Sequence, residues 1–346
     1  MKRISPFLLF ILIVLFGCNN KTQIKIPKVQ ITNFKIDSCS IRAINVLSDS
    51  TLAFTGSNGI FGIINNKGEI STFKKITKDS VKPEFRSIAS TKNAVFILSV
   101  SNPALLYKFK NDSLSLVYKE TNKKVFYDSM KFFDENNGIA IGDPTENCIS
   151  LIKTNDGGNS WNKVPCSNLP KMAEGEAAFA ASNTNLKVLN NKAWIVTGGL
   201  KSHVFYSLDK GKTWKSSNTP IVSGKNTTGI YSVDFFDENH GIIAGGDYTN
   251  KFGESVNKAI TTNGGKTWSA IAKNTFPNYV SCVQYVPNSK GEKIVAVSTN
   301  GIFYSANSGK KWKKLSDKGF YSIRFVNHNT AWLSGNNVLA KMELKY

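Results

Sequence analysis

Arginine is scarce in this strongly basic chain, so the few arginines are the first candidates for chemistry. The 346 residues carry 44 Lys and Arg against 24 Asp and Glu, a formal charge of +20, yet the arginines are only Arg3, Arg42, Arg86 and Arg324. A planar guanidinium can hold a carboxylate or phosphate through two parallel hydrogen bonds, which a lysine ammonium cannot do. Arg42 and Arg86 therefore predict recognition of an anionic group.

The chain contains several repeated units of β-strands. Arg42 and Arg86 each lie at the start of the first strand of such a unit, and aligning the first strands of the other units gives one equivalent residue from each. In a closed ring of such units, these residues meet at one end of a central channel, together with the loops between the second and third strands. We expect a binding site there. The aligned ring is Arg42, Arg86, Asp128, Glu176, Tyr231, Ser281 and Tyr321, and the loop residues are Asp143, Lys201, His203 and Asp247.

A purely structural role for the same residues is an open alternative. Arg42 and Arg86 could form ion pairs with Asp128 and Glu176 and fill the channel, because structural ion-pair networks often resemble binding sites. Arg324 follows its core residue Ile323 instead of preceding it, so we expect its side chain to point away from Arg42 and Arg86.

Carboxylates at the same end raise the alternative of catalysis. Glu174 and Glu176 flank Gly175, directly before the small residues 177–181. Glu176 with Asp128 or Asp143 could act as the acid and base of a glycosidase. Such acids are more often turn or channel groups, so we favour a non-catalytic binding or assembly scaffold over a glycan-active enzyme.

Other chemistries lack their motifs. The three histidines, His203, His240 and His328, are scattered without metal-ligand spacing, so no metal is predicted. The chain has no Cys-x-x-Cys, no Gly-x-x-x-x-Gly-Lys and no Gly-x-Gly-x-x-Gly between a strand and a helix, so no cofactor is predicted and a Rossmann-type oxidoreductase is weakly supported. A sialidase would need a third arginine on the substrate and an Arg-Ile-Pro motif, both missing here.

One motif repeats four times and indicates which elements position these residues. Its frame is Ser/Thr-x-Asp/Asn-x-Gly-x-x-Trp, with copies roughly 50 residues apart, a spacing typical of propellers and solenoids. The Asp or Asn can bond turn amides, the Gly permits a positive φ and the Trp packs into a seam while its N–H seeks an acceptor. The key pairs are Asp156 and Trp161, Asp209 and Trp214, Asn263 and Trp268, and Asn307 and Trp312.

Strand signals dominate the chain and divide it into blades. Short β-branched or aromatic runs are bounded by Gly, Asn, Asp or Ser. Six units cover residues 38–76, 83–120, 125–165, 174–218, 229–271 and 278–315. Residues 318–346 supply about three more strands. An N-terminal strand over 24–34 would complete the last blade and remove open edges. The prediction is an all-β, seven-bladed β-propeller.

The motif resembles the Asp-box, or bacterial-neuraminidase (BNR) repeat, a structural element of enzymes and non-enzymes alike. The whole mature chain resembles the photosystem II assembly/stability-factor-like propeller family, exported BNR-repeat proteins often labelled oxidoreductase. The resemblance rests on segments 85–88, 142–144, 174–182, 220–224 and 245–247. It implies a propeller that handles a protein partner, in photosynthetic members during assembly of a membrane complex.

The N-terminal residues have the pattern of an export signal peptide. Lys2 and Arg3 precede an apolar run over 7–16, and residues 15–18 resemble a lipobox ending in Cys18. We expect a lipoprotein signal peptide over 1–17, a lipidated Cys18 and tether over 18–28, and a single propeller over 29–346. The chain is then periplasmic and membrane-anchored, with a protein or anionic small-ligand partner and no nucleic acid.

Two of the cysteines could form a disulfide in that compartment. Cys148 and Cys166 lie on opposite arms of the hairpin around Gly157, so a disulfide is plausible in an oxidising periplasm, with two buried thiols as an equal alternative. The excess charge is almost entirely lysine at turns and on polar alternations. This lysine distribution indicates a surface that keeps the protein soluble. The alternative is that the positive charge attracts anionic lipids or acidic partners.

Overall fold

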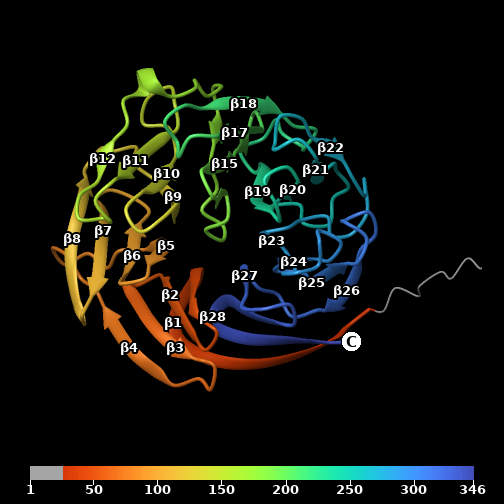
Figure 1. The fold of residues 1–346 in the computed structure, drawn as a ribbon, viewed down its shortest axis with the longest axis horizontal. Helices are drawn as coiled ribbons and strands as arrows, with labels where there is room; N and C mark the ends of the chain where they lie inside the picture. Colours follow the sequence, from red (N-terminus) through yellow and green to blue (C-terminus); the bar gives the residue numbers. More distant parts are fainter. Residues whose placement is uncertain (1–25) are drawn as a thin grey trace, which may run out of the picture.

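The strands of this chain form a closed ring of antiparallel sheets. In the computed structural model, residues 26–346 are described, so the predicted signal peptide and Cys18 lie outside the described residues. Figure 1 views the ring along its channel, with the chain running round it from β1 to β28. No helix within 26–346 is long and apolar enough to span a membrane.

Four sheets of four strands make up most of the ring. Their strands are β5 (Phe85–Thr91), β6 (Ala94–Ser99), β7 (Ala104–Lys110) and β8 (Ser113–Glu120); β9 (Tyr127–Phe132), β10 (Gly138–Gly142), β11 (Ser150–Thr154) and β12 (Asn162–Lys163); β14 (Leu186–Leu189), β15 (Lys192–Val196), β17 (His203–Ser207) and β18 (Lys215–Asn218); and β23 (Cys282–Tyr285), β24 (Ile294–Ser298), β25 (Gly301–Ser305) and β26 (Lys313–Ser316).

Two larger sheets of six strands complete the ring. One contains β13 (Glu176–Ala177), β16 (Gly198–Gly199), β19 (Thr228–Phe235), β20 (Gly241–Asp247), β21 (Lys258–Thr261) and β22 (Ser269–Ala270). The other contains β27 (Ser322–Phe325), β28 (Thr330–Lys345), β1 (Lys28–Ser48), β2 (Thr51–Gly56), β3 (Ile60–Asn65) and β4 (Ile70–Lys75).

The prediction of seven blades is wrong, because the described residues form six sheets and hence six blades. The first and last predicted blades are one sheet. β1 pairs with β28 from Lys28 to Ser40 and then with β2 from Ile41 to Ser48. The N-terminal segment does pair with the C-terminal strand, but the pairing continues into the first predicted blade without a break. The sequence pattern identified the strands and could not show that two long strands join the ends of the chain.

Apolar side chains from neighbouring sheets form the core. One cluster combines Ala43 and Phe61 of the first sheet with Phe85 and Ile97 of the second. Each sheet therefore buries both faces against its neighbours, which explains the nearly continuous burial of strands such as β6 and β20. The short 3₁₀ turn η1 (Cys166–Asn168) follows β12.

The four repeated motifs form hairpin turns, as the sequence predicts. In the first, Asp156 Oδ1 accepts hydrogen bonds from the amides of Asn159 (2.9 Å) and Ser160 (3.1 Å), and Gly158 has a φ of +74°. The hydroxyl of Thr154 accepts a bond from the Gly158 amide at 2.9 Å, and the other three copies repeat this contact.

The predicted acceptor for the indole N–H is found in only two of the four copies. Trp268 and Trp312 donate to the carbonyl of the motif glycine, at 3.1 and 2.8 Å. The buried indole nitrogens of Trp161 and Trp214 have no partner in the described part of the chain. The side chains of these two tryptophans therefore contribute through apolar packing alone.

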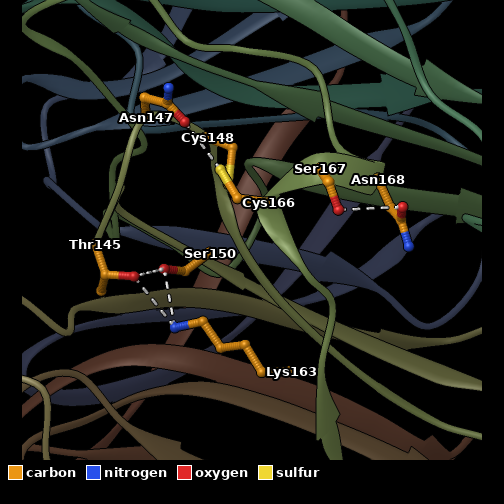
Figure 2. Close-up of a disulfide and its surroundings, with 8 residues drawn as sticks. All are labelled: Thr145, Asn147, Cys148, Ser150, Lys163, Cys166, Ser167 and Asn168. Carbon is orange, nitrogen blue, oxygen red and sulfur yellow. Dashed lines mark hydrogen bonds between the residues drawn. A yellow bond between two sulfur atoms is a disulfide. The ribbon is translucent and has the colours of Figure 1, made fainter.

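A disulfide joins Cys148 and Cys166, whose Cα atoms are 5.7 Å apart (Figure 2). It ties the segment after β10 to η1. Below it, Lys163 contacts the hydroxyls of Thr145 and Ser150, and it also forms a 2.6 Å ion pair with Glu120 of the neighbouring sheet. Cys39 and Cys282 are buried free thiols.

Candidate functional site

β-Bulges in the innermost strands turn four of the seven predicted ring residues towards one end of the channel. In the pairing of β1 with β2, Ile41 lies opposite Gly56 and Ala43 opposite Thr55, so Arg42 is the extra residue. The pairings of β5, β9 and β19 each leave one such residue. A bulge re-aims the side chain of its extra residue. The extra residues are Arg42, Arg86, Asp128 and Tyr231.

A cavity of about 470 Å³ lies at this end, and we call it the arginine mouth. Its lining combines two arginines and a lysine with six aromatic rings, a run of alanines and one carboxylate. The lining residues are Arg42, Arg86, Phe126, Asp143, Ala177, Ala178, Phe179, Ala180, Ala181, Asn226, Tyr231, Tyr248, Lys251, Tyr279, Ser281, Thr299 and Tyr321. The cavity therefore offers positive charge on an apolar, aromatic wall.

Arg42 is held in place but keeps free donors. Its Nη1 donates to the carbonyl of Ala181 at 3.3 Å, and its guanidinium lies 4.3 Å from the centre of the Tyr321 ring. Its buried Nε has no partner among the described residues. Burial, together with the nearby charge of Arg86, lowers the pKa of Arg42. An anion placed between the two arginines would relieve that repulsion.

Arg86 is paired with a carboxylate at the rim. Its Nε and Nη2 both donate to Glu84 Oε1 at 2.7 Å, and Glu84 is 38% exposed. Exposed ion pairs of this kind contribute little to stability, ~0.2–1 kcal/mol. Within residues 26–346, neither Arg86 nor Arg42 forms an ion pair with Asp128 or Glu176. The alternative in which these ion pairs fill the channel is therefore wrong.

The channel is filled by backbone instead. Residues 177–185, which we call the central segment, run into the middle of the ring before β14 begins (the yellow-green loop at the centre of Figure 1). Ser182, Asn183 and Asn185 are fully buried there. The segment bonds to all six sheets through contacts with Arg42, Ile88, Ser129, Met130, Val196, Val233, Ser281, Ser322 and Arg324. It therefore closes the channel beneath the arginine mouth.

Two carboxyl groups lie near the arginines without neutralising them. Asp128 is completely buried, and neither carboxyl oxygen has a partner among the described residues. Burial and the neighbouring Asp143 raise the pKa of Asp128 well above its usual range, which favours its neutral form. Burial also raises the pKa of Asp143 to about 6, although its Oδ1 accepts a 2.8 Å hydrogen bond from the Ala178 amide.

Glu176 does not line the arginine mouth. Its carboxylate is 0% exposed and accepts bonds from the Ala173 amide (2.9 Å), the Thr197 hydroxyl and His203 Nδ1 (2.9 Å). The hydrogen bond to Glu176 raises the pKa of His203. Because the central segment interrupts the repeat in this unit, buried Glu176 and half-buried His203 form a separate pair. This geometry does not favour a glycosidase that uses Glu176 with Asp128 or Asp143.

The other predicted loop residues lie outside the cavity lining. Glu174 and Lys201 are exposed, and Asp247 caps its own turn by accepting bonds from Thr249. Sequence alignment of the units missed Tyr248, Tyr279 and Lys251, which line the mouth from loops or strand ends outside the aligned frame. No group of residues within 26–346 has the composition of a metal site.

Arg324 lies at the opposite end of the channel, as the sequence predicts. Its Nη2 donates to the carbonyls of Ser182 and Asn183, both at 3.1 Å, and its Nη1 donates to Ile323 O at 2.7 Å. It lines a second, smaller cavity of about 210 Å³ rather than the arginine mouth. The third substrate-binding arginine of a sialidase is therefore missing from the arginine mouth.

No family model matches this chain, and no curated protein matches it. Solved structures with the same fold do exist. "YCF48 bound to D1 peptide" has a TM-score of 0.66 at 12% identity over 92% of this chain and 99% of that one. YCF48 from Cyanidioschyzon merolae gives 0.61 at 11% identity over 90% and 98%. The WD40 repeats of RRP9 give 0.64 at 12% identity over 93% and 99%.

These matches establish the propeller fold for nearly the whole described chain. The resemblance drawn from the sequence is supported at this level, since two of the similar structures are YCF48 propellers. Propellers in this group include one that was solved with a bound peptide. The matches do not test an oxidoreductase activity, which stays a weakly supported alternative.

Proposed function

We propose that this protein is a non-catalytic binding propeller that takes a carboxylate-bearing segment of a protein partner into the arginine mouth. The observation that carries the proposal is the pair Arg42 and Arg86 at a 470 Å³ cavity, with guanidinium donors left over after their contacts to Ala181 O and Glu84. Burial raises the pKa of Asp128 and of Asp143, which disfavours their charged forms and leaves more of that positive charge available to a ligand.

The lining favours a protein segment over a free inorganic anion. Tyr231 is stacked on Phe179 with ring centres 4.4 Å apart, and Tyr279 meets Tyr231 edge-on at 5.5 Å. Fixed aromatic rings beside arginines suit an anionic group attached to an apolar or aromatic side chain. The peptide bound by YCF48, a propeller of similar fold, supports a partner of this class.

The test uses random-sequence peptide libraries that lack Asp and Glu and differ only in a free or amidated C-terminal carboxylate. We expect the protein to enrich free-acid peptides and the Arg42→Gln/Arg86→Gln variant to bind them at least ~100-fold more weakly, since it loses at least one charge-assisted hydrogen bond of ~1.5–3 kcal/mol at each arginine. The control, Lys67→Gln/Lys75→Gln, removes the same charge from two exposed lysines and should bind like wild type. Equal enrichment of amidated peptides, or unchanged binding by the arginine variant, would contradict the proposal.

The proposal includes a lipid anchor at Cys18 that holds the propeller at the outer face of a bacterial inner membrane or the inner face of an outer membrane. Support comes from the basic, apolar and Leu-Phe-Gly-Cys segments in order over residues 2–18, and from the Cys148–Cys166 disulfide, which is typical of oxidising compartments. In cells fed an alkyne fatty acid, the wild-type chain should be labelled and membrane-bound. A Cys18→Ser variant that is still labelled would disprove the anchor.

A further inference from the structure

The end of the channel opposite the arginine mouth holds a second cavity, which we call the lysine mouth. It measures about 210 Å³, and its lining comes chiefly from the innermost strands. Six strands each contribute one polar residue near their far ends: Asn45 (β1), Lys131 (β9), Lys187 (β14), Asp234 (β19), Gln284 (β23) and Arg324 (β27). Polar groups from most of the ring therefore meet in one small space.

The single carboxylate in this cavity already has its partners. Asp234 Oδ1 forms a 2.6 Å ion pair with Lys187, and Oδ2 accepts a 2.8 Å bond from the Tyr285 amide. Asp234 therefore balances the charge of Lys187 and leaves nothing for the other two cations.

Arg324 and Lys131 have no carboxylate partner among residues 26–346. The hydrogen bonds of Arg324 go to the hydroxyl of Ser322, the thiol of Cys282 and three backbone carbonyls, all neutral, and its Nε–H makes none. Lys131 makes neither a hydrogen bond nor an ion pair within that range. The pKa of Lys131 lies well below its usual range, chiefly because its ammonium is buried and next because Arg324 and Lys187 carry positive charge nearby. Cys282 and Asp234 raise the pKa by smaller amounts.

We propose that the lysine mouth binds a small inorganic dianion of the phosphate or sulfate class, held by Lys131 and Arg324. A bound dianion would favour the charged form of Lys131, and its two charges would then match Lys131 and Arg324, since Asp234 is already paired with Lys187. Donors remain for its oxygens on Lys131, on Arg324 Nε and on the Gln284 amide, whose carbonyl oxygen already accepts from Phe325 N at 2.9 Å. The cavity is smaller than the ~300–1,000 Å³ of organic-ligand pockets, so a free anion with a few waters fits it best.

The test is titration of the purified chain with sodium phosphate and sodium sulfate, with sodium chloride at matched ionic strength as the reference. Calorimetry should give one saturable site for each dianion and none for chloride, and the melting temperature should rise with dianion concentration. Lys131→Met should weaken dianion binding at least ~10-fold. The matched control is Lys153→Met, because Lys153 is also half-buried but donates to Gly211 O outside this cavity. It should bind as wild type does.

A second variant keeps the test independent of how Lys131→Met folds. Gln284→Glu keeps the oxygen that accepts from Phe325 and adds a negative charge to the cavity, so it should abolish dianion binding. Loss of binding in both variants with retention in Lys153→Met is the expected result. Equal responses to chloride and phosphate in the wild-type chain, or unchanged affinity in Lys131→Met or Gln284→Glu, would overturn the proposal.

Discussion

The two ends of the channel both carry positive charge, but they use their arginines in opposite ways. At the arginine mouth, Arg42 and Arg86 keep donors free over an aromatic cavity, and their one carboxylate partner, Glu84, lies at the exposed rim. At the lysine mouth, the Nη groups of Arg324 donate hydrogen bonds to neutral groups, including two carbonyls of the buried central segment. An arginine in the channel can therefore recognise a ligand only through the donors that its own contacts leave free, which at Arg324 is the Nε–H alone.

The largest effect should come from removing the structural arginine. Arg324→Met leaves the carbonyls of Ser182 and Asn183 short of donors in the buried channel, and an unsatisfied buried polar group costs ~1–3 kcal/mol. We expect a loss of ~3 kcal/mol in unfolding free energy, measured by urea denaturation. Arg86→Met should lose less than ~1 kcal/mol because its partner is exposed. Equal losses for the two variants would remove the distinction between the mouths.

The second effect concerns the buried acid beneath the arginine mouth. Because the pKa of Asp128 is raised in the fold, wild-type stability should fall as pH rises from the usual carboxyl range of about 4 towards that raised value, by ~1.4 kcal/mol for each unit crossed. Below pH 4, Asp128 is protonated in both the folded and the unfolded state, so the free energy of unfolding is not lowered. Asp128→Asn cannot ionise, so its advantage over wild type should grow with pH in denaturation curves. A constant difference across pH would show that Asp128 is not the titrating group.

A smaller effect should follow from freeing Arg86. Glu84→Gln removes the rim carboxylate and makes both guanidinium donors more available, so an enriched free-acid peptide should bind up to ~5-fold more tightly, corresponding to ~1 kcal/mol. Fluorescence anisotropy with that peptide measures the change. Weaker binding would mean that Glu84 positions Arg86 for its ligand rather than competing with it.

The smallest effect should come from the aromatic partner of Arg42. Tyr321→Leu removes a ring 4.3 Å from the guanidinium and loses a cation–π contact of ~0.5–1 kcal/mol, so peptide affinity should fall ~2–5-fold. The same anisotropy assay applies. Dianion binding at the lysine mouth is the internal control and should not change, since Tyr321 does not line that cavity.

The sequence predicted features that depend on local repeats. The four hairpin turns follow from the hydroxyl, Asp or Asn, and Gly positions, because their hydrogen bonds form within a few residues, as at Thr154 and Gly158. Alignment of the units also brought Arg42, Arg86 and Tyr231 to one cavity, because each begins an equivalent inner strand. The bulges that turn these residues into the channel have no signal of their own in the sequence.

Features that depend on distant pairing were not predictable in the same way. Glu176 was aligned with the ring, but the central segment breaks the repeat there, and its contacts with six sheets involve residues far apart in the chain. The blade count failed for a similar reason, since the continuity of β1 and β28 arises from contacts between the two ends. The lysine mouth was missed because its residues lie three positions beyond the aligned ring on most strands.

The pairing of β1 with β28 has a consequence for how the protein is made. Lys28 lies opposite Lys345 and Lys35 opposite Val338, so β1 cannot complete its pairing before β28 has been synthesised. Contacts between such distant residues form slowly, and partly folded chains with unpaired strand edges are prone to aggregate. Until β28 leaves the ribosome, the N-terminal half of β1 has no partner on that side. Chaperones that shield exposed β-edges would therefore act on this chain at β1, and truncation within β28 would leave the matching part of the β1 edge unpaired.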